Sequence, residues 1–138
     1  MIFRKRVKPI NLQHLDELEP LLESGRPILL DFWQTGCQPC RTMDGIVNEL
    51  AEEYAGGAHI VKVNLGHVPA AIQEFGIKST PTFVLLGRSQ KKPSKKARRK
   101  GAGDPRAGAV TPRWRASGLV NKAVIARVLE SNGAVRAE

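Results

Sequence analysis

The sequence predicts an α/β domain in which a central β-sheet carries helices on both faces. Short apolar runs alternate along the chain with segments whose apolar residues recur at helical spacing, which is the pattern of this fold class. Glycine and proline mark many of the boundaries between these segments. A length of 138 residues suits one domain with a hydrophobic core of its own, so we expect a single domain over residues 1–138.

The first two elements are expected to be an edge strand and a helix. Residues 6–11, RVKPIN, suit a short edge strand, because a proline is tolerated there. Leucines at helical spacing predict a helix over residues 12–25, with Asn11 as its N-cap. We expect Pro20 to bend or split this helix and Gly25 to end it.

The remaining elements follow from the same patterns. The apolar run PILLDFW at residues 27–33 contains one acid and predicts a buried central strand. An amphipathic helix is expected from Pro39 to the glycine pair at 56–57. After it we expect a strand over 59–65, a short helix over 69–77, a strand over 82–87 and a last helix over 118–133. The buried side of the last helix is expected to carry Val120, Val124, Val128 and Leu129.

The net charge of +9 is concentrated in one part of the chain. Residues 88–115 contain 11 Lys and Arg against 1 Asp, whereas residues 1–87 contain 8 basic and 10 acidic residues. We define the basic segment as residues 88–113. It is rich in Lys, Arg, Gly, Ala and Pro and has almost no apolar periodicity, which predicts a disordered, low-complexity insertion within the domain.

The same composition points to a soluble cytoplasmic protein that has no membrane segment. No apolar stretch approaches the roughly 18–20 residues that span a bilayer. The early basic residues are not followed by an apolar run, which argues against a signal peptide. Two cysteines do not make the disulfide framework of a small secreted domain.

Both cysteines of the chain, Cys37 and Cys40, lie between a predicted strand and a predicted helix. Residues three apart on a helical turn are close enough for a disulfide, and a loop this short adds little stability by chain entropy. Cys37 would face unpaired N–H groups and the positive end of the helix dipole, which favour the reactive thiolate. Cys40 would be shielded and suited to resolve a mixed disulfide. The pair is therefore predicted to be a redox device.

Two alternatives carry less support. A zinc site would need about four ligands, and the three histidines have no metal-ligand spacing relative to the cysteines, so the expected metal is none unless subunits share a site. An inert structural disulfide would be unusual in a cytoplasmic protein.

Four stretches give the chain a specific resemblance to a known family. They are PILLDFWQTGCQPCRTM, IVKVNL, FGIKSTPTFVLL and ASGLVNKAVIARVL, and their spacing resembles that of the thioredoxin family throughout. That family is itself a known example of a Cys-x-x-Cys pair with a lowered thiol pKa. The resemblance implies a thioredoxin-like fold with a mixed sheet, in which the basic segment replaces the turn between the last two strands.

The resemblance also implies an activity, which is the reduction of protein disulfides by thiol–disulfide exchange. The implied partners are disulfide-containing protein substrates and a recycling enzyme of the thioredoxin-reductase type, drawing on NADPH or a similar donor. The implied cofactor is none.

Residue roles follow from the same resemblance. Cys37 would attack, Cys40 would resolve, Asp31 would assist proton transfer at Cys40, and Lys62 would pair with Asp31. An acid within an apolar strand is in any case costly unless it is paired or functional. Lys62 alone could also be a charge at a strand edge.

A substrate site is implied beside the cysteines, with Thr80-Pro81 as a cis-proline loop on which a substrate chain pairs as an extra strand. Gly76 matches a family glycine near that groove. The substrate-binding residues that the resemblance implies are Trp33, Gln38, Pro39, Thr80, Pro81 and Gly118.

Three positions depart from the family pattern. Gly36 stands where thioredoxins usually carry a second tryptophan, which removes apolar docking surface and changes the expectation for partner recognition. Gln38 replaces a glycine between the cysteines, where the dipeptide tunes the redox potential. Gly45 replaces a helix-kinking proline, so the helix should be straighter or locally loose.

The basic segment leaves alternatives open. In the expected fold it lies roughly 15 Å or more from the cysteines, because a five-residue strand separates them. Residues 91–100 could contact nucleic acid non-specifically, with Trp114 as the nearby aromatic. The segment could instead dock an acidic protein, be an inert solvated insertion, or be a stretch read in a shifted frame. The alternative function is thus a thioredoxin-like binding module whose basic loop docks nucleic acid or an acidic partner.

Overall fold

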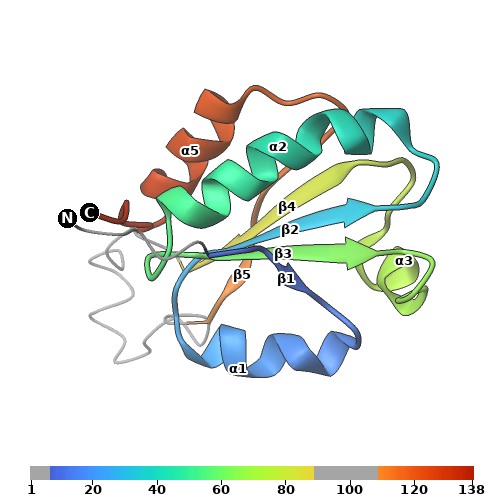
Figure 1. Cartoon of the computed structure of the whole chain (residues 1–138). Coiled ribbons are helices and arrows are strands. Elements are labelled where there is room, and N and C mark those ends of the chain that lie inside the picture. Colours follow the sequence, from blue (N-terminus) through green and yellow to red (C-terminus); the bar gives the residue numbers. More distant parts are fainter. Residues whose placement is uncertain (1–6, 89–108) are drawn as a thin grey trace, which may run out of the picture.

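The computed structural model describes residues 7–88 and 109–138, and these residues form a mixed five-stranded sheet with helices on both faces (Figure 1). The strands are β1 (Ile10–Asn11), β2 (Ile28–Trp33), β3 (His59–Asn64), β4 (Thr82–Gly87) and β5 (Thr111–Ser117). The helices are the 3₁₀ turn η1 (Leu15–Glu17), α1 (Leu18–Glu23), α2 (Gln38–Glu53), α3 (Ala70–Phe75) and α5 (Lys122–Ser131). The sheet order is β1-β3-β2-β4-β5, in which β1, β3 and β2 are parallel and the β2–β4 and β4–β5 pairs are antiparallel. The predicted fold class is confirmed.

The central strand β2 is covered on both faces, as its apolar run predicted. Alternate residues such as Leu30 and Phe32 join a core formed with α1 and α3. Leu29 joins a second core formed with α2 and α5, and Figure 1 shows these two helices on the opposite face of the sheet. Because successive side chains of a strand point to opposite faces, Asp31 must face the α2 side together with Leu29. No helix of the described residues is long and apolar enough to cross a membrane.

The first helix begins later than its leucine pattern predicted, and Asn11 is not its N-cap. Asn11 belongs to β1, and His14 precedes the first turn. The carboxylate of Glu17 accepts the backbone N–H groups of Gln13 at 2.6 Å and His14 at 2.7 Å, which satisfies donors that the helix start leaves unpaired. Pro20 lies in the first turn of α1, where a missing N–H costs little, so it does not split the helix there.

The last helix also begins later than predicted, and its buried stripe runs through Ile125, Val128 and Leu129 but not through Val124. The side-chain oxygen of Asn121 accepts the N–H of Ala123 at 2.8 Å and caps α5. Ile125 and Leu129, four residues apart, are fully buried against the sheet, whereas Val124 is 39% exposed. The expectation that Val124 faces the core is therefore wrong, because the buried stripe runs through Ile125.

The basic segment is shorter at its C-terminal end than residues 88–113. Strand β5 starts at Thr111, so Thr111 to Arg113 pair with β4 instead of belonging to the insertion. Trp114, proposed from the sequence as a stacking aromatic, is half-buried in β5 and packs against the core between the sheet and α2. Residues 89–108, and with them the expectations of disorder and of nucleic-acid contact at 91–100, lie outside the described residues.

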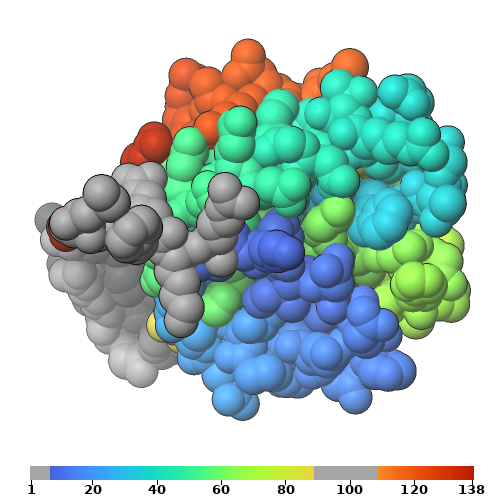
Figure 2. Space-filling model, viewed as in Figure 1, coloured from blue at the N-terminus to red at the C-terminus, as the bar shows by residue number. Residues whose placement is uncertain are grey.

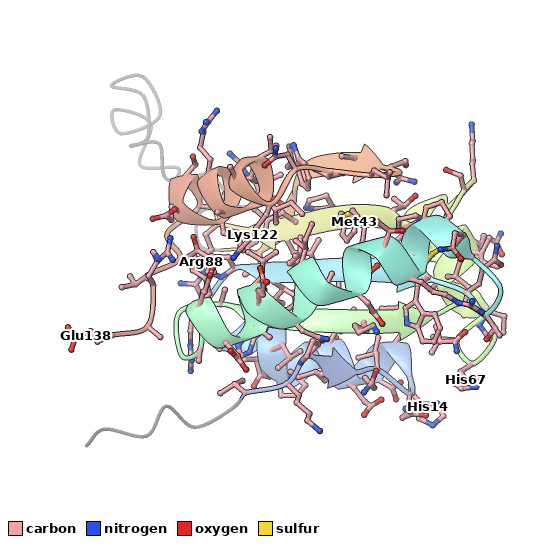
Figure 3. All side chains as sticks on the ribbon, turned by 45° about the horizontal axis from the view of Figure 1, so that its top comes forward. His14, Met43, His67, Arg88, Lys122 and Glu138 are labelled. Carbon is pink, nitrogen blue, oxygen red and sulfur yellow. A yellow bond between two sulfur atoms is a disulfide. The ribbon has the colours of Figure 1, made fainter. Side chains whose placement is uncertain are left out.

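The chain leaves the described part of the sheet far from the cysteines. Because β4 is antiparallel to β2, Gly87 lies at the end where β2 begins, and β2 leads at its other end to the cysteines. Figure 3 shows Arg88 and Glu138 at one end of the molecule and His67, which follows β3, at the other. The expectation that the basic segment begins at the end of the sheet away from the cysteines is thus confirmed at Arg88.

A close backbone contact at Gly57 fixes the C-terminal segment, and we expect Gly57→Ala to destabilise the fold. A Cβ at Gly57 would lie 1.9 Å from the carbonyl oxygen of Val135. The same segment is held by an N–H of Ala137 that donates to the carbonyl of Glu53 at 2.7 Å. A backbone clash of this kind should lower the free energy of unfolding by about 1–3 kcal/mol, measured by urea denaturation.

Gly45→Ala is the matched control for this prediction. Gly45 lies within α2 and a Cβ there would meet no atom within 4 Å, so alanine should stabilise the helix by about 0.5–1 kcal/mol. Equal urea midpoints for the two variants would contradict the importance of the contact at Gly57.

Candidate active site

A disulfide joins Cys37 and Cys40 at the junction of β2 and α2, with the two Cα atoms 5.2 Å apart. Cys37 is the N-cap of α2, and its sulfur accepts the backbone N–H of Cys40 at 3.2 Å. Pro39 lies in the first helical turn, where its missing N–H is harmless. The predicted Cys37–Cys40 disulfide and the predicted position of Cys37 at a helix N-terminus are both confirmed. This end of a helix stabilises negative charge, which is what a reactive thiolate carries.

The two cysteine residues differ in exposure. Cys37 is half-buried, whereas the residue Cys40 is only 6% exposed. A small hollow of about 100 Å³ is lined by both cysteines together with Trp33, Arg41 and Asp44. Figure 2 shows the loop between β2 and α2 on the surface beside α3. A second protein can therefore reach Cys37 more readily than Cys40.

The residue before the first cysteine shapes this opening. Gly36 has φ of +83°, a left-handed conformation that favours glycine, and a Cβ placed there would meet nothing within 4 Å. The loop is also tied across the site, because the Gln34 amide donates to the Thr80 hydroxyl at 3.2 Å. Glycine in place of the family's usual tryptophan at position 36 is thus suited to the left-handed backbone conformation of this loop.

Asp31 is a buried acid in β2, the strand that leads to the cysteine loop. It is 2% exposed, and its Oδ1 atom has no hydrogen-bond partner among the described residues. Burial raises the pKa of Asp31 from 3.8 to about 7, an effect that Lys62 opposes and Asp44 reinforces. A carboxyl with this pKa can take up or release a proton near neutral pH.

Lys62 does not form the ion pair with Asp31 that the resemblance implied. Its ammonium donates instead to the carboxylate of Asp44 on α2, at 2.5 Å, and lies 4.9 Å from the centre of the Trp33 ring. Asp31 on β2 and Lys62 on β3 are register partners, so their backbones lie side by side. The Lys62 side chain nevertheless reaches Asp44 instead of the Asp31 carboxyl. The alternative of a strand-edge charge is also wrong, because β3 lies between β1 and β2.

The loop before β4 supplies the other side of the site. The Thr80–Pro81 peptide bond is cis, as the resemblance implied. The carbonyl of Pro81 accepts the N–H of Gly118 at 2.9 Å, which brings this predicted pair together. Gly76 ends α3 with φ of +61°, and its carbonyl accepts the Arg115 guanidinium at 2.6 Å. This loop and the end of β5 are thus held together beside β2.

Sequence reasoning missed two residues of the site. Asp44 binds Lys62, and Gln34 ties the cysteine loop to Thr80. Asp44 could have been found, because it lies four residues after Cys40 and therefore on the same face of the helix. No sequence pattern singled out Gln34.

The fold and this site define a protein that exchanges dithiols with disulfides. A family model described as Thioredoxin matches residues 10–103. Thioredoxin 1 of Nostoc sp. is 38% identical over 73 residues, which are 53% of this chain and 68% of that protein. The chain belongs to the thioredoxin family, and its Cys37–Cys40 pair makes it a thiol–disulfide oxidoreductase. The family and the activity predicted from the sequence are confirmed.

Two further comparisons describe the extent of the likeness. A chloroplastic M-type thioredoxin of Brassica napus is 38% identical over 72 residues, which are 52% of this chain but only 41% of that longer protein. A mutant thioredoxin from Halobacterium salinarum has the same fold, with a TM-score of 0.68 and 20% identity over 97% of this chain and 98% of the other.

Proposed function

We propose that the protein reduces disulfides in other proteins, with Cys37 as the attacking thiol, Cys40 as the resolving thiol and Asp31 as the proton carrier. One observation carries this proposal: Cys37, the more exposed cysteine of the pair, lies at the N-terminus of α2, and its sulfur accepts a backbone N–H. The same N–H would stabilise a thiolate in the dithiol state.

In the first step, the Cys37 thiolate attacks one sulfur of the substrate disulfide. A Cys37–substrate bond forms, the substrate S–S bond breaks, and the second substrate sulfur leaves as a thiolate that takes a proton from solvent. The substrate is then held as a mixed disulfide, and Cys40 is still a thiol.

In the second step, Asp31 as a carboxylate accepts the proton of the Cys40 thiol. The Cys40 thiolate attacks the Cys37 sulfur, the Cys37–Cys40 disulfide forms, and the substrate leaves as a thiolate. Two electrons have passed from the protein to the substrate. The raised pKa of Asp31 supports this role, because a group that titrates near neutral pH can both accept and return the proton.

We place the substrate around the predicted docking residues. Gln38 is exposed at the start of α2. The loop that precedes it is joined to the Thr80–Pro81 loop by the hydrogen bond from Gln34 to Thr80. A substrate strand could pair with the backbone at Thr80, and Gly118 beside Pro81 leaves space for it. With Gly36 in place of a large aromatic, apolar contact on this side rests on Trp33 and Pro39.

The partners follow from this chemistry. The substrates are proteins with accessible disulfides, and a reductase of the thioredoxin-reductase type returns the Cys37–Cys40 disulfide to the dithiol. The electrons move between sulfur atoms, so we assign no bound cofactor. A reductant of this kind works in a reducing compartment, and we propose the cytoplasm, which cell fractionation can check.

The experiment is reduction of insulin by the purified full chain, with dithiothreitol as the recycling donor. We expect insulin B chains to precipitate well before they do with dithiothreitol alone, because the Cys37 thiolate is the better nucleophile at neutral pH. A folded protein with two titratable thiols that does not exceed the dithiothreitol background would contradict the proposal. Equilibration with glutathione then gives the reduction potential.

A further inference from the structure

Asp44 is an acidic side chain at the rim of the active site that the reaction steps above do not use. It lies on α2 one turn after Cys40, lines the same small hollow as both cysteines, and its side chain is 48% exposed. Its carboxylate binds the ammonium of Lys62 at 2.5 Å, and the Lys62 side chain is 15% exposed. A partly buried lysine is therefore held by an acid from the helix that starts with the redox pair.

Two contacts fix where the Lys62 ammonium lies. Asp44 accepts its hydrogen bond from above the sheet, and the ring of Trp33 lies 4.9 Å away. Lys62 is the register partner of Asp31 on the neighbouring strand, so a different side-chain rotamer could bring its ammonium toward that carboxyl. The Asp31 Oδ1 atom nevertheless has no hydrogen-bond partner among the described residues.

The surroundings of Asp31 contain few charges. From β3 it is faced by Lys62, and from α2 by Asp44, and these are the two charged groups within residues 7–88 and 109–138 that act on its carboxyl. From β4 its register partner is Phe83, which is uncharged and fully buried. Cys40, also on α2, titrates only when the disulfide is reduced. The position of one ammonium therefore decides whether this buried carboxyl has a cationic partner.

We propose that Asp44 is a positioning residue for the exchange reaction: by holding the Lys62 ammonium, it leaves the carboxyl of Asp31 without an ion-pair partner and so able to carry the proton of Cys40. This inference rests on the proposed role of Asp31. Removing Asp44 abolishes one negative charge and frees Lys62 to approach Asp31, and both changes favour the ionised carboxyl.

The test follows the titration of Asp31 directly, in the oxidised protein, where neither cysteine titrates. The full chain is labelled with ¹³C at the aspartate carboxyl, which gives four signals, from Asp16, Asp31, Asp44 and Asp104. The Asp31 signal is assigned by its loss in Asp31→Asn. In Asp44→Asn we expect the Asp31 titration midpoint to fall by about one pH unit or more. An unchanged midpoint would overturn the inference.

Glu49→Gln is the matched control. Glu49 also lies on α2 and also binds a lysine, Lys122, at 2.8 Å, so the substitution removes the same charge from the same helix. It should leave the Asp31 midpoint in place. An equal fall in Glu49→Gln and Asp44→Asn would mean that net charge, and not the position of Lys62, sets the titration.

A double-mutant cycle separates the direct effect of Asp44 from its effect through Lys62. Lys62→Met should raise the Asp31 midpoint, because a positive charge is lost. In that background Asp44→Asn should lower the midpoint by less than half as much as in the wild type. A full effect without Lys62 would overturn the positioning role.

The pH profile of insulin reduction then distinguishes this inference from the proposed function. A lower Asp31 midpoint in Asp44→Asn should move the acidic limb of the profile to lower pH by a similar amount. If the carboxyl signal moves and the profile does not, Asp44 positions Lys62 as inferred and the proton-carrier role of Asp31 fails instead.

Discussion

Replacing Cys37 with serine is expected to abolish disulfide reduction, down to the rate of dithiothreitol alone. Cys37 is the more exposed cysteine, and its place at the N-terminus of α2 supplies a backbone N–H and the helix dipole to a thiolate. A serine hydroxyl remains protonated there and cannot attack a disulfide. We expect the protein-dependent rate of insulin reduction, measured above the dithiothreitol background, to fall by about 10³-fold or more.

Cys40→Ser is the informative partner of this variant. Its Cys37 thiol should still attack, but the mixed disulfide has no resolving thiol and should accumulate. Mass spectrometry would then show a covalent adduct with the substrate for Cys40→Ser and none for Cys37→Ser. The opposite pattern would reverse the two roles, and adducts with neither variant would contradict the exchange mechanism.

The second large effect is on stability: Asp31→Asn should stabilise the oxidised protein at alkaline pH. The pKa of Asp31 is about 7 in the folded protein against 3.8 ordinarily, so the folded state binds the proton more tightly than the unfolded state. Stability is therefore lost as pH rises from about 4 to about 7 and stays low above that. The difference between the two pKa values corresponds to about 4 kcal/mol.

Asparagine does not ionise, so the stability of Asp31→Asn should not fall as the pH rises from about 4 to about 7. Urea denaturation at pH 8.5 should show the variant to be more stable by up to about 4 kcal/mol, and at pH 4 the difference should nearly vanish. Asp16→Asn, at an exposed position, is the control and should change stability by less than about 0.5 kcal/mol at either pH. Equal stability of Asp31→Asn and the wild type at pH 8.5 would show that Asp31 is not held protonated by burial.

The same variant tests activity. Without a carboxyl to accept the Cys40 proton, release of the mixed disulfide near pH 7 should slow by about 10²-fold. Stabilisation together with slower turnover is the combination expected of a buried acid that is retained for chemistry.

Local patterns were enough to predict most of the secondary structure and the redox pair. The apolar run of β2 predicted a strand that is buried on both faces, and the Cys-x-x-Cys spacing at a strand-to-helix junction predicted the disulfide and its helix N-terminus. These features depend on residues close together in sequence. The helix starts were less well predicted: Asn11 was expected to cap the first helix but belongs to β1, and the last helix was expected from residue 118 although Asn121 caps it.

Contacts between distant residues decided the rest. Patterns along the chain were enough to predict the fold class, the pair of cysteines, and an acid and a lysine on neighbouring strands. That Lys62 binds Asp44 and not Asp31 follows from long-range packing, because α2 packs over the sheet and places the Asp44 carboxylate beside the ammonium. Long-range packing also placed Trp114 in a strand of the sheet and began β5 at Thr111. The physical reason is the same in each case. A charged group or an aromatic ring contacts the residues that packing brings close to it, and those residues can be distant in the sequence.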